Sequence, residues 1–249
     1  MRVAVLADIH ANLPALEAVL AEPDVASADA VVLLGDIALG PMPAPTLDRL
    51  AALGDRAVWV HGNCEREMVT AFDRGGVPGP NAADAIASAA LIGRDHRDRL
   101  DRLPLTVTLD IDGLGPILFC HASPRRDDEM LLVDSPPQRW ARALDGVGAA
   151  VVVCGHTHMP FIRLAYRRQI INPGSVGMPY GGEGAHWALL ADRAVTMCRT
   201  RYDVEAACAA IGEQSDYPDV AEWTDYFLCS RASDADALAA FAPRDGRAG

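Results

Sequence analysis

Residues 1–20 read MRVAVLADIHANLPALEAVL, and in this stretch the apolar run Val3–Ala7 ends directly at Asp8-Ile9-His10. Short apolar runs bounded by turn residues are typical of buried strands. Four more islands along the chain follow such runs: Gly35-Asp36, Gly62-Asn63-Cys64-Glu65, Cys120-His121 and Gly155-His156-Thr157-His158. Open α/β folds build their sites beyond the carboxyl ends of the strands, so we expect all five islands to meet at one edge of a sheet.

The side chains of these islands are typical of a metal centre. Carboxylates, imidazoles and an amide together suit Mn, Fe, Zn, Co or Ni better than Ca or Mg. Two such ions about 3.5 to 4 Å apart can activate a bridging hydroxide and stabilise both oxygens of an in-line displacement. The pattern therefore favours phosphoester hydrolysis.

The order and spacing of the islands resemble the calcineurin-like metallophosphoesterase superfamily, whose pattern is DxH, GD, GN(H/C)(D/E), H and GHxH. The resemblance runs from Arg2 to about Cys198. Three segments are similar to the small bacterial and archaeal phosphodiesterase branch of this superfamily: Asp8–Leu20, Gly62–Glu67 and Asn172–Gly177.

The resemblance implies two divalent transition-metal ions, with manganese favoured over iron, zinc, cobalt and nickel. It assigns to the first ion the ligands Asp8, His10, Asp36 and His158, and to the second Asp36, Asn63, His121 and His156. Catalytic roles are expected for Asp36, Asn63, Cys64 and His121. Contacts to a small phosphoester substrate are expected from Asn12, Asn63, Arg66 and Asn172.

Cys64 departs from the wider superfamily, in which many members carry a histidine that helps to protonate the leaving group. A thiol does this less well near neutral pH, so esters with poor leaving groups should react slowly. The leading hypothesis is a phosphodiesterase in which a metal-bridging hydroxide attacks phosphorus. A phosphomonoesterase, a protein phosphatase and a dinucleoside polyphosphate hydrolase are alternatives within the enzymes. A catalytically weak metal-binding scaffold is the alternative outside them.

The order of predicted elements favours an α/β fold. A β-α-β beginning is followed, from Thr106 onward, by a second series of strands, which fits a four-layer α/β/β/α sandwich of two mixed sheets flanked by helices. We expect a helix over Ala82–Arg94 and a metallophosphoesterase domain over residues 1–201. Residues 202–249 are predicted to form a C-terminal helical extension, a cap or a dimer contact, with a frayed end at Pro243–Gly249.

Composition excludes several classes of protein. Half of the 249 residues are hydrophobic, which excludes a disordered chain, and the net charge of -12 argues against binding polymeric nucleic acid. No apolar run approaches the ~18 residues of a membrane span, and no signal-peptide pattern is present, so we expect a cytoplasmic protein with no membrane partner. The six cysteines form no CxxC pair, which argues against a disulfide framework. The sequence leaves open whether the protein forms a homo-oligomer.

Overall fold

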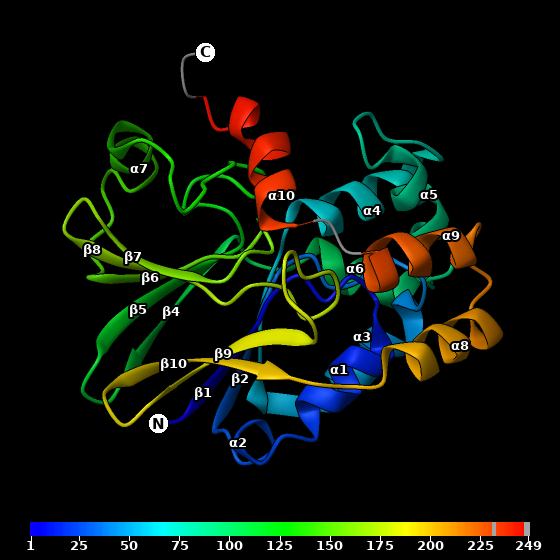
Figure 1. Ribbon diagram of the computed structural model, residues 1–249, viewed down its shortest axis with the longest axis horizontal. Coiled ribbons are helices and arrows are strands. Elements are labelled where there is room, and N and C mark those ends of the chain that lie inside the picture. The colour runs from blue at the N-terminus through cyan, green and yellow to red at the C-terminus, as the bar shows by residue number, and fades with distance from the viewer. Residues whose placement is uncertain (231–232, 247–249) are drawn as a thin grey trace.

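The computed structural model describes residues 1–230 and 233–246 and contains two five-stranded sheets (Figure 1). The first sheet has the strand order β10-β9-β1-β2-β3, with the bounds Ala194–Thr200, Ala185–Ala191, Val3–Leu6, Ala30–Leu34 and Ala57–Val60. Strands β1, β2 and β3 are parallel, whereas β9 runs antiparallel to β1 and β10 antiparallel to β9. The carboxyl ends of β1, β2 and β3 therefore lie at one edge.

The second sheet has the strand order β4-β5-β6-β8-β7, with the bounds Thr106–Ile111, Gly115–Cys120, Val151–Val153, Arg168–Asn172 and Phe161–Ala165. Its central strands β5, β6 and β8 are parallel, and β4 and β7 pair antiparallel at the two edges. Both sheets are mixed, as predicted.

The core lies in layers because side chains alternate across each strand. Val3 and Val5 pack in the cluster between the two sheets, whereas Ala4 and Leu6 pack against helices. The helices on the first sheet are α1 to α6, with the bounds Leu13–Leu20, Pro23–Ala26, Pro43–Ala51, Asn63–Arg74, Ala82–Ala90 and Arg94–Asp101. Helix α7, Pro137–Ala143, covers the second sheet through Trp140. The predicted four-layer sandwich is confirmed.

One predicted helix is divided in two. The expected helix Ala82–Arg94 ends at Ala90, because Gly93 takes an extended conformation and caps the separate helix α6. A 3₁₀ turn at Gly54–Arg56 leads into β3. Among the described residues the longest helix, α4, has 12 residues, and no helix has the length and apolar character that crossing a membrane requires.

The residues after Tyr202 form a helical extension on the same side of the molecule as the ends of β1 and β2 (Figure 1). Its elements are α8, α9, a π-helix, α10 and a 3₁₀ turn, with the bounds Val204–Gln214, Val220–Thr224, Asp225–Ser230, Asp234–Phe241 and Ala242–Arg244. The expectation of a frayed end was wrong for its described part, because Asp245 is buried and accepts a hydrogen bond from Ser135 Oγ at 2.8 Å. Residues 247–249 of that segment lie outside the described residues. The domain boundary after residue 201 stays a prediction.

Candidate metal centre

The five islands meet where the strands end. The loops after β1 and β2 are joined by backbone hydrogen bonds from Asp8 N to Gly35 O at 3.1 Å and from His10 N to Asp36 O at 3.0 Å. Within the second sheet, Gly155 N donates to His121 O at 2.6 Å, and across the two sheets His156 N donates to the Asp8 carboxylate at 3.1 and 3.2 Å. These bonds fix the ligand loops to one another, so the site does not depend on any single loop.

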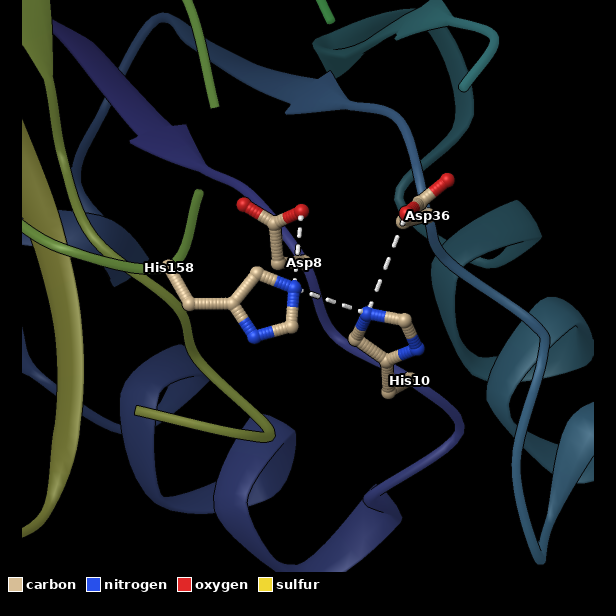
Figure 2. Close-up of side chains that lie close together, drawn as sticks. All are labelled: Asp8, His10, Asp36 and His158. Atoms are coloured by element: carbon tan, nitrogen blue, oxygen red, sulfur yellow. Dashed lines mark hydrogen bonds and ion pairs between the residues drawn. The ribbon is translucent and has the colours of Figure 1, made fainter. Parts of the chain in front are cut away.

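A first group of ligand atoms comes from Asp8, His10, Asp36 and His158 (Figure 2). These atoms all lie within 4.8 Å of one another. His10 Nε2 lies 3.2 Å from His158 Nε2, and His158 Nε2 lies 3.5 Å from Asp8 Oδ1. Two imidazole nitrogens and carboxylate oxygens therefore converge on one point, as ligands of a cation do.

A second group comes from Asp36, His121 and His156, whose ligand atoms also lie within 4.8 Å of one another. His121 Nε2 lies 3.2 Å from Asp36 Oδ2. Asn63 Oδ1, His121 Nε2 and both ring nitrogens of His156 are buried and have no hydrogen-bond partner among the described residues. Buried polar atoms almost always have a partner, so these atoms fit a bound cation.

Three of the histidines are oriented by backbone carbonyls. The Nδ1 atoms of His10, His121 and His158 lie 3.0, 2.7 and 2.8 Å from the carbonyl oxygens of Leu39, Leu34 and Met178. A ring that donates from Nδ1 keeps a lone pair on Nε2, the form that binds a metal. All three Nε2 atoms point into the ligand groups described above.

The backbone at the site is strained. Five of the predicted ligands have a left-handed conformation, with φ of 53° at Asp8, 48° at His10, 49° at Asp36, 67° at His156 and 58° at His158. Such a conformation costs about 1–3 kcal/mol for a residue other than glycine and is concentrated at functional sites. The packing of the surrounding fold holds these five residues in the left-handed conformation at the ends of the strands.

The charges of the site are set by burial and by mutual attraction. Burial alone would raise the pKa of Asp36, but the neighbouring imidazole of His121 holds it well below its ordinary value. Burial opposes a charge on His121 as well, yet Asp36 raises the pKa of His121 to about 10. Burial, with repulsion from His121, lowers the pKa of His156 to about 4. The pocket thus attracts positive charge beside Asp36 and keeps His156 neutral, as a ligand must be.

Glu65 holds the Asp36 loop, a role that the sequence did not reveal. Its carboxylate is fully buried and accepts N–H bonds from Asp36 at 2.8 Å, Ile37 at 2.7 Å and Gly62 at 2.8 Å. A buried carboxylate satisfied in this way fixes the backbone around it. The acidic residue in the island Gly62–Glu65 was the available signal.

Two glycines give the ligands room. Gly35 has φ of +83°, and a Cβ there would lie 2.6 Å from His121 Nδ1. Gly62 has an ordinary φ, but a Cβ would lie 2.3 Å from Asp36 Oδ1. The first glycine is required by conformation and contact, the second by contact alone.

Two residues predicted to touch substrate have structural positions instead. Asn12 is fully buried; its Oδ1 caps α1 by accepting from Ala15 N at 3.2 Å, and its Nδ2 donates to Gly177 O. Asn172 is also fully buried and donates to Gly155 O at 2.8 Å and to Thr157 Oγ1 at 3.0 Å. Neither lines the cavity over the ligands, because both amides hold loops behind it.

Asn63, Cys64 and Arg66 do line this cavity. Asn63 Nδ2 donates to Glu67 Oε1 at 3.2 Å, which leaves the buried Oδ1 as the amide atom available to a cation. Cys64 is 2% exposed, and burial together with Asp36 raises the pKa of its thiol well above the ordinary value. The guanidinium of Arg66 is paired with Asp127, at 2.7 and 3.1 Å.

The cavity, here named the metal cleft, has a volume of about 500 Å³. Several of its lining residues come from the C-terminal extension or the loop before β9, among them Tyr180, Tyr226 and Arg244. Tyr180 stacks on His158 with ring centroids 5.4 Å apart. Because Tyr180 and Arg244 reach the cleft only through the fold, no local pattern predicted these two residues.

Comparisons with known proteins give matches to the sequence and to the fold. The sequence profile of the family described as "Calcineurin-like phosphoesterase superfamily domain" matches residues 1–193. An uncharacterized protein of Methanocaldococcus jannaschii is 27% identical over 229 residues, which cover 82% of this chain and 89% of that protein. A crystal structure of a metallophosphoesterase from Sphaerobacter thermophilus is similar, with a TM-score of 0.69 and 26% identity over 86% of this chain and 94% of that one. A hypothetical protein from Pyrococcus horikoshii OT3 has the same fold, with a TM-score of 0.76 and 21% identity over 93% and 99%.

Proposed function

The chain belongs to the calcineurin-like phosphoesterase superfamily, and we propose that it is a phosphodiesterase that uses two divalent transition-metal ions to hydrolyse a small phosphodiester. One observation carries the proposal. Two groups of buried ligand atoms share Asp36 and face an open cleft of about 500 Å³.

Two bound ions in such a site supply a water-derived nucleophile at neutral pH and neutralise charge on the reacting phosphate. The chain supplies their placement. Asp36 stands between the two groups, with one oxygen 3.2 Å from His121 Nε2 and 3.9 Å from His10 Nε2. Its other oxygen accepts the backbone N–H of Cys64 at 3.0 Å, which prevents rotation of the carboxylate.

The charge of the cleft supports a diester over a monoester. Glu67, Asp84 and Asp128 line the cleft, and Arg66 is paired with Asp127. Arg244 is a second cation on the wall of the cleft. A monoester carries close to two negative charges at neutral pH and a diester one, so an acidic wall disfavours the monoester more.

The ligand atoms support manganese among the transition metals. Oxygen atoms of Asp8, Asp36 and Asn63 accompany the imidazole nitrogens. The thiol of Cys64 holds its proton because burial raises its pKa, so it does not compete as a thiolate ligand. Carboxylate and carbonyl oxygens suit manganese, and the groups contain no thiolate, although their imidazole nitrogens also suit iron, zinc and nickel.

The test compares two esters with the same leaving group. We expect the manganese-loaded protein to contain about two ions per chain and to hydrolyse bis(4-nitrophenyl) phosphate faster than 4-nitrophenyl phosphate, judged by kcat/KM. Removal of the ions with a chelator should abolish both activities, and added manganese should restore them. A faster monoester would overturn the diester assignment, and no turnover with Mn, Ni, Co or Zn would favour the scaffold.

A further inference from the structure

A second hollow joins the metal cleft. It has a volume of about 580 Å³ and is formed by α5 and the C-terminal extension. We name it the aromatic groove, after Tyr217, Trp223, Tyr226 and Phe227, which line it together with Ile86. Asp84, Trp223, Tyr226 and Phe227 line both the groove and the metal cleft. The two hollows are therefore adjacent, and a molecule with its phosphate at the ligands has the groove beside it.

The rings of the groove are held against one another. Tyr226 and Phe227 pack edge to face with centroids 4.8 Å apart, and Phe227 lies 5.2 Å from Trp223. Tyr226 is nevertheless 60% exposed, and Ile86 is 43% exposed. An exposed apolar surface with fixed aromatic rings is typical of a binding site rather than of a core.

The charges around the groove restrict what it can bind. Its acidic residues are Asp84, Asp219 and Glu222, and among the described residues no lysine or arginine lines it. A second phosphate or a carboxylate would be repelled there. A flat, uncharged ring gains the stacking surface without meeting a like charge.

We propose that the aromatic groove binds an uncharged aromatic group of the phosphodiester substrate, while the phosphate lies at the metal centre. The inference rests on the proposed function and narrows it to esters that carry such a ring, for example an aryl or nucleoside group. It also gives the C-terminal extension its role, because three of the rings come from α9 and the π-helix that follows it. A second copy of the chain seated on this face is the competing occupant that the test must separate.

The experiment keeps the leaving group constant and changes only the other ester group. The substrates are 4-nitrophenyl phenyl phosphate and 4-nitrophenyl ethyl phosphate, and the readout is the ratio of their kcat/KM values. We expect the wild-type protein to prefer the phenyl ester and this ratio to fall about tenfold in Tyr226→Ser, since a stacked ring pair contributes that order of affinity. Ile86→Glu, which adds a charge to the groove outside the metal cleft, should lower the ratio in the same direction.

Matched controls come from an exposed apolar surface on β7 and the turn after it. Tyr166 is 61% exposed and Ile162 is 43% exposed, close to the values of Tyr226 and Ile86. Tyr166→Ser and Ile162→Glu should leave the ratio unchanged. An unchanged ratio in folded Tyr226→Ser and Ile86→Glu would overturn the inference. So would a dimer that Tyr226→Ser converts to a monomer with the ratio unaltered, because the groove would then be a contact between copies.

A binding measurement separates this inference from the proposed function. Benzyl(methyl)phosphinate and dimethylphosphinate carry one negative charge, as a diester does, have no ester bond to hydrolyse and differ only in the ring, and calorimetry on the manganese-loaded protein gives their affinities. We expect a preference for benzyl(methyl)phosphinate that is lost in Tyr226→Ser. If the protein shows this binding preference but hydrolyses neither ester, the proposed phosphodiesterase activity is refuted and the aromatic binding site is retained. If it hydrolyses the esters but shows no binding preference, the activity is retained and the aromatic binding site is refuted.

Discussion

The metal centre and the aromatic groove lie side by side but are built differently. At the metal centre Asp8 and Asp36 are almost fully buried, and backbone bonds join the loops that carry them. In the groove Tyr226 is 60% exposed, and ring contacts rather than a polar network hold it. Reacting groups need placement to within about 0.5 Å, while a stacking surface tolerates variation. We expect changes at the metal centre to decide whether the protein turns over and changes in the groove to decide which ester it prefers.

The largest effect should come from Asp36→Asn, which tests the metal centre directly. The change removes one negative charge from both ligand groups, so both ions should bind more weakly. We expect kcat/KM to fall by at least about a hundredfold. The loss of a residue that only hydrogen-bonds a metal ligand already lowers activity by about 10- to 100-fold, and Asp36 is itself a proposed ligand. Asp192→Asn is the control, because Asp192 is 89% exposed. If elemental analysis finds two ions per chain in folded Asp36→Asn and its turnover is normal, Asp36 is not a ligand shared by both ions.

A smaller effect is expected from Glu65→Gln, which leaves the ligands in place and loosens their loop. The backbone N–H groups that now donate to the Glu65 carboxylate would meet the NH₂ group of glutamine, which cannot accept their hydrogen bonds. Hydrogen bonds to a charged group are worth about 1.5–3 kcal/mol, and we expect the free energy of unfolding to fall by about that amount. Turnover should drop about tenfold.

Denaturant unfolding and metal titration of Glu65→Gln measure these two changes. The control is Glu17→Gln, because Glu17 is an exposed partner of Arg49, and such pairs contribute about 0–1 kcal/mol. Equal stability of the two variants would show that Glu65 does not fix the Asp36 loop.

Arg244→Gln tests the border between the two regions. Arg244 lies on the wall of the metal cleft and comes from the turn that ends the C-terminal extension. An exposed charge pair is worth about 0.2–1 kcal/mol, so KM for a phosphodiester should rise up to about fivefold with little change in kcat. The rise should shrink at high salt because exposed charges are screened. Arg94→Gln, on α6 and outside the lining of the metal cleft, should leave KM unaltered. A large fall in kcat in Arg244→Gln would instead assign Arg244 to the chemistry.

The smallest effect is expected from Cys64→Ala. Burial raises the pKa of this thiol, so it holds its proton and makes a poor general acid. Turnover of 4-nitrophenyl esters, which need little protonation, should stay within about twofold of the wild-type value. A fall in activity of a hundredfold, measured at equal metal content, would show that Cys64 takes part in catalysis.

The ligand set could be predicted from the sequence because its pattern is local. Each ligand follows a short apolar strand, and parallel strands bring their ends to one edge. The structure brings the predicted Asp and His side chains into two groups that share Asp36, with Asp8, His10 and His158 on one side and His121 and His156 on the other. That these residues and Asn63 bind metal stays a prediction. The sandwich was predictable for the same reason, since short apolar runs bounded by turn residues indicate buried strands.

The substrate residues were harder to predict because their roles depend on partners far away in the chain. Asn12 and Asn172 belong to conspicuous motifs, yet their amides hold Gly177 and Gly155. Arg66 lies at the cleft, but its charge is paired with Asp127, 61 positions later. A motif gives the residue type, and only the packed fold gives its hydrogen-bond partners.

The sequence by itself determined the strands, their polar ends and the metal chemistry that those side chains support. Only the tertiary structure decided that β9 and β10 join the first sheet, that Glu65 holds the Asp36 loop, and that the C-terminal extension builds an aromatic wall beside the ligands. The physical reason is the range of the interactions. Strand periodicity and turn chemistry act between neighbours in the chain, whereas the wall forms only when residues more than 130 positions apart, such as Asp84 and Tyr217, come within hydrogen-bond distance.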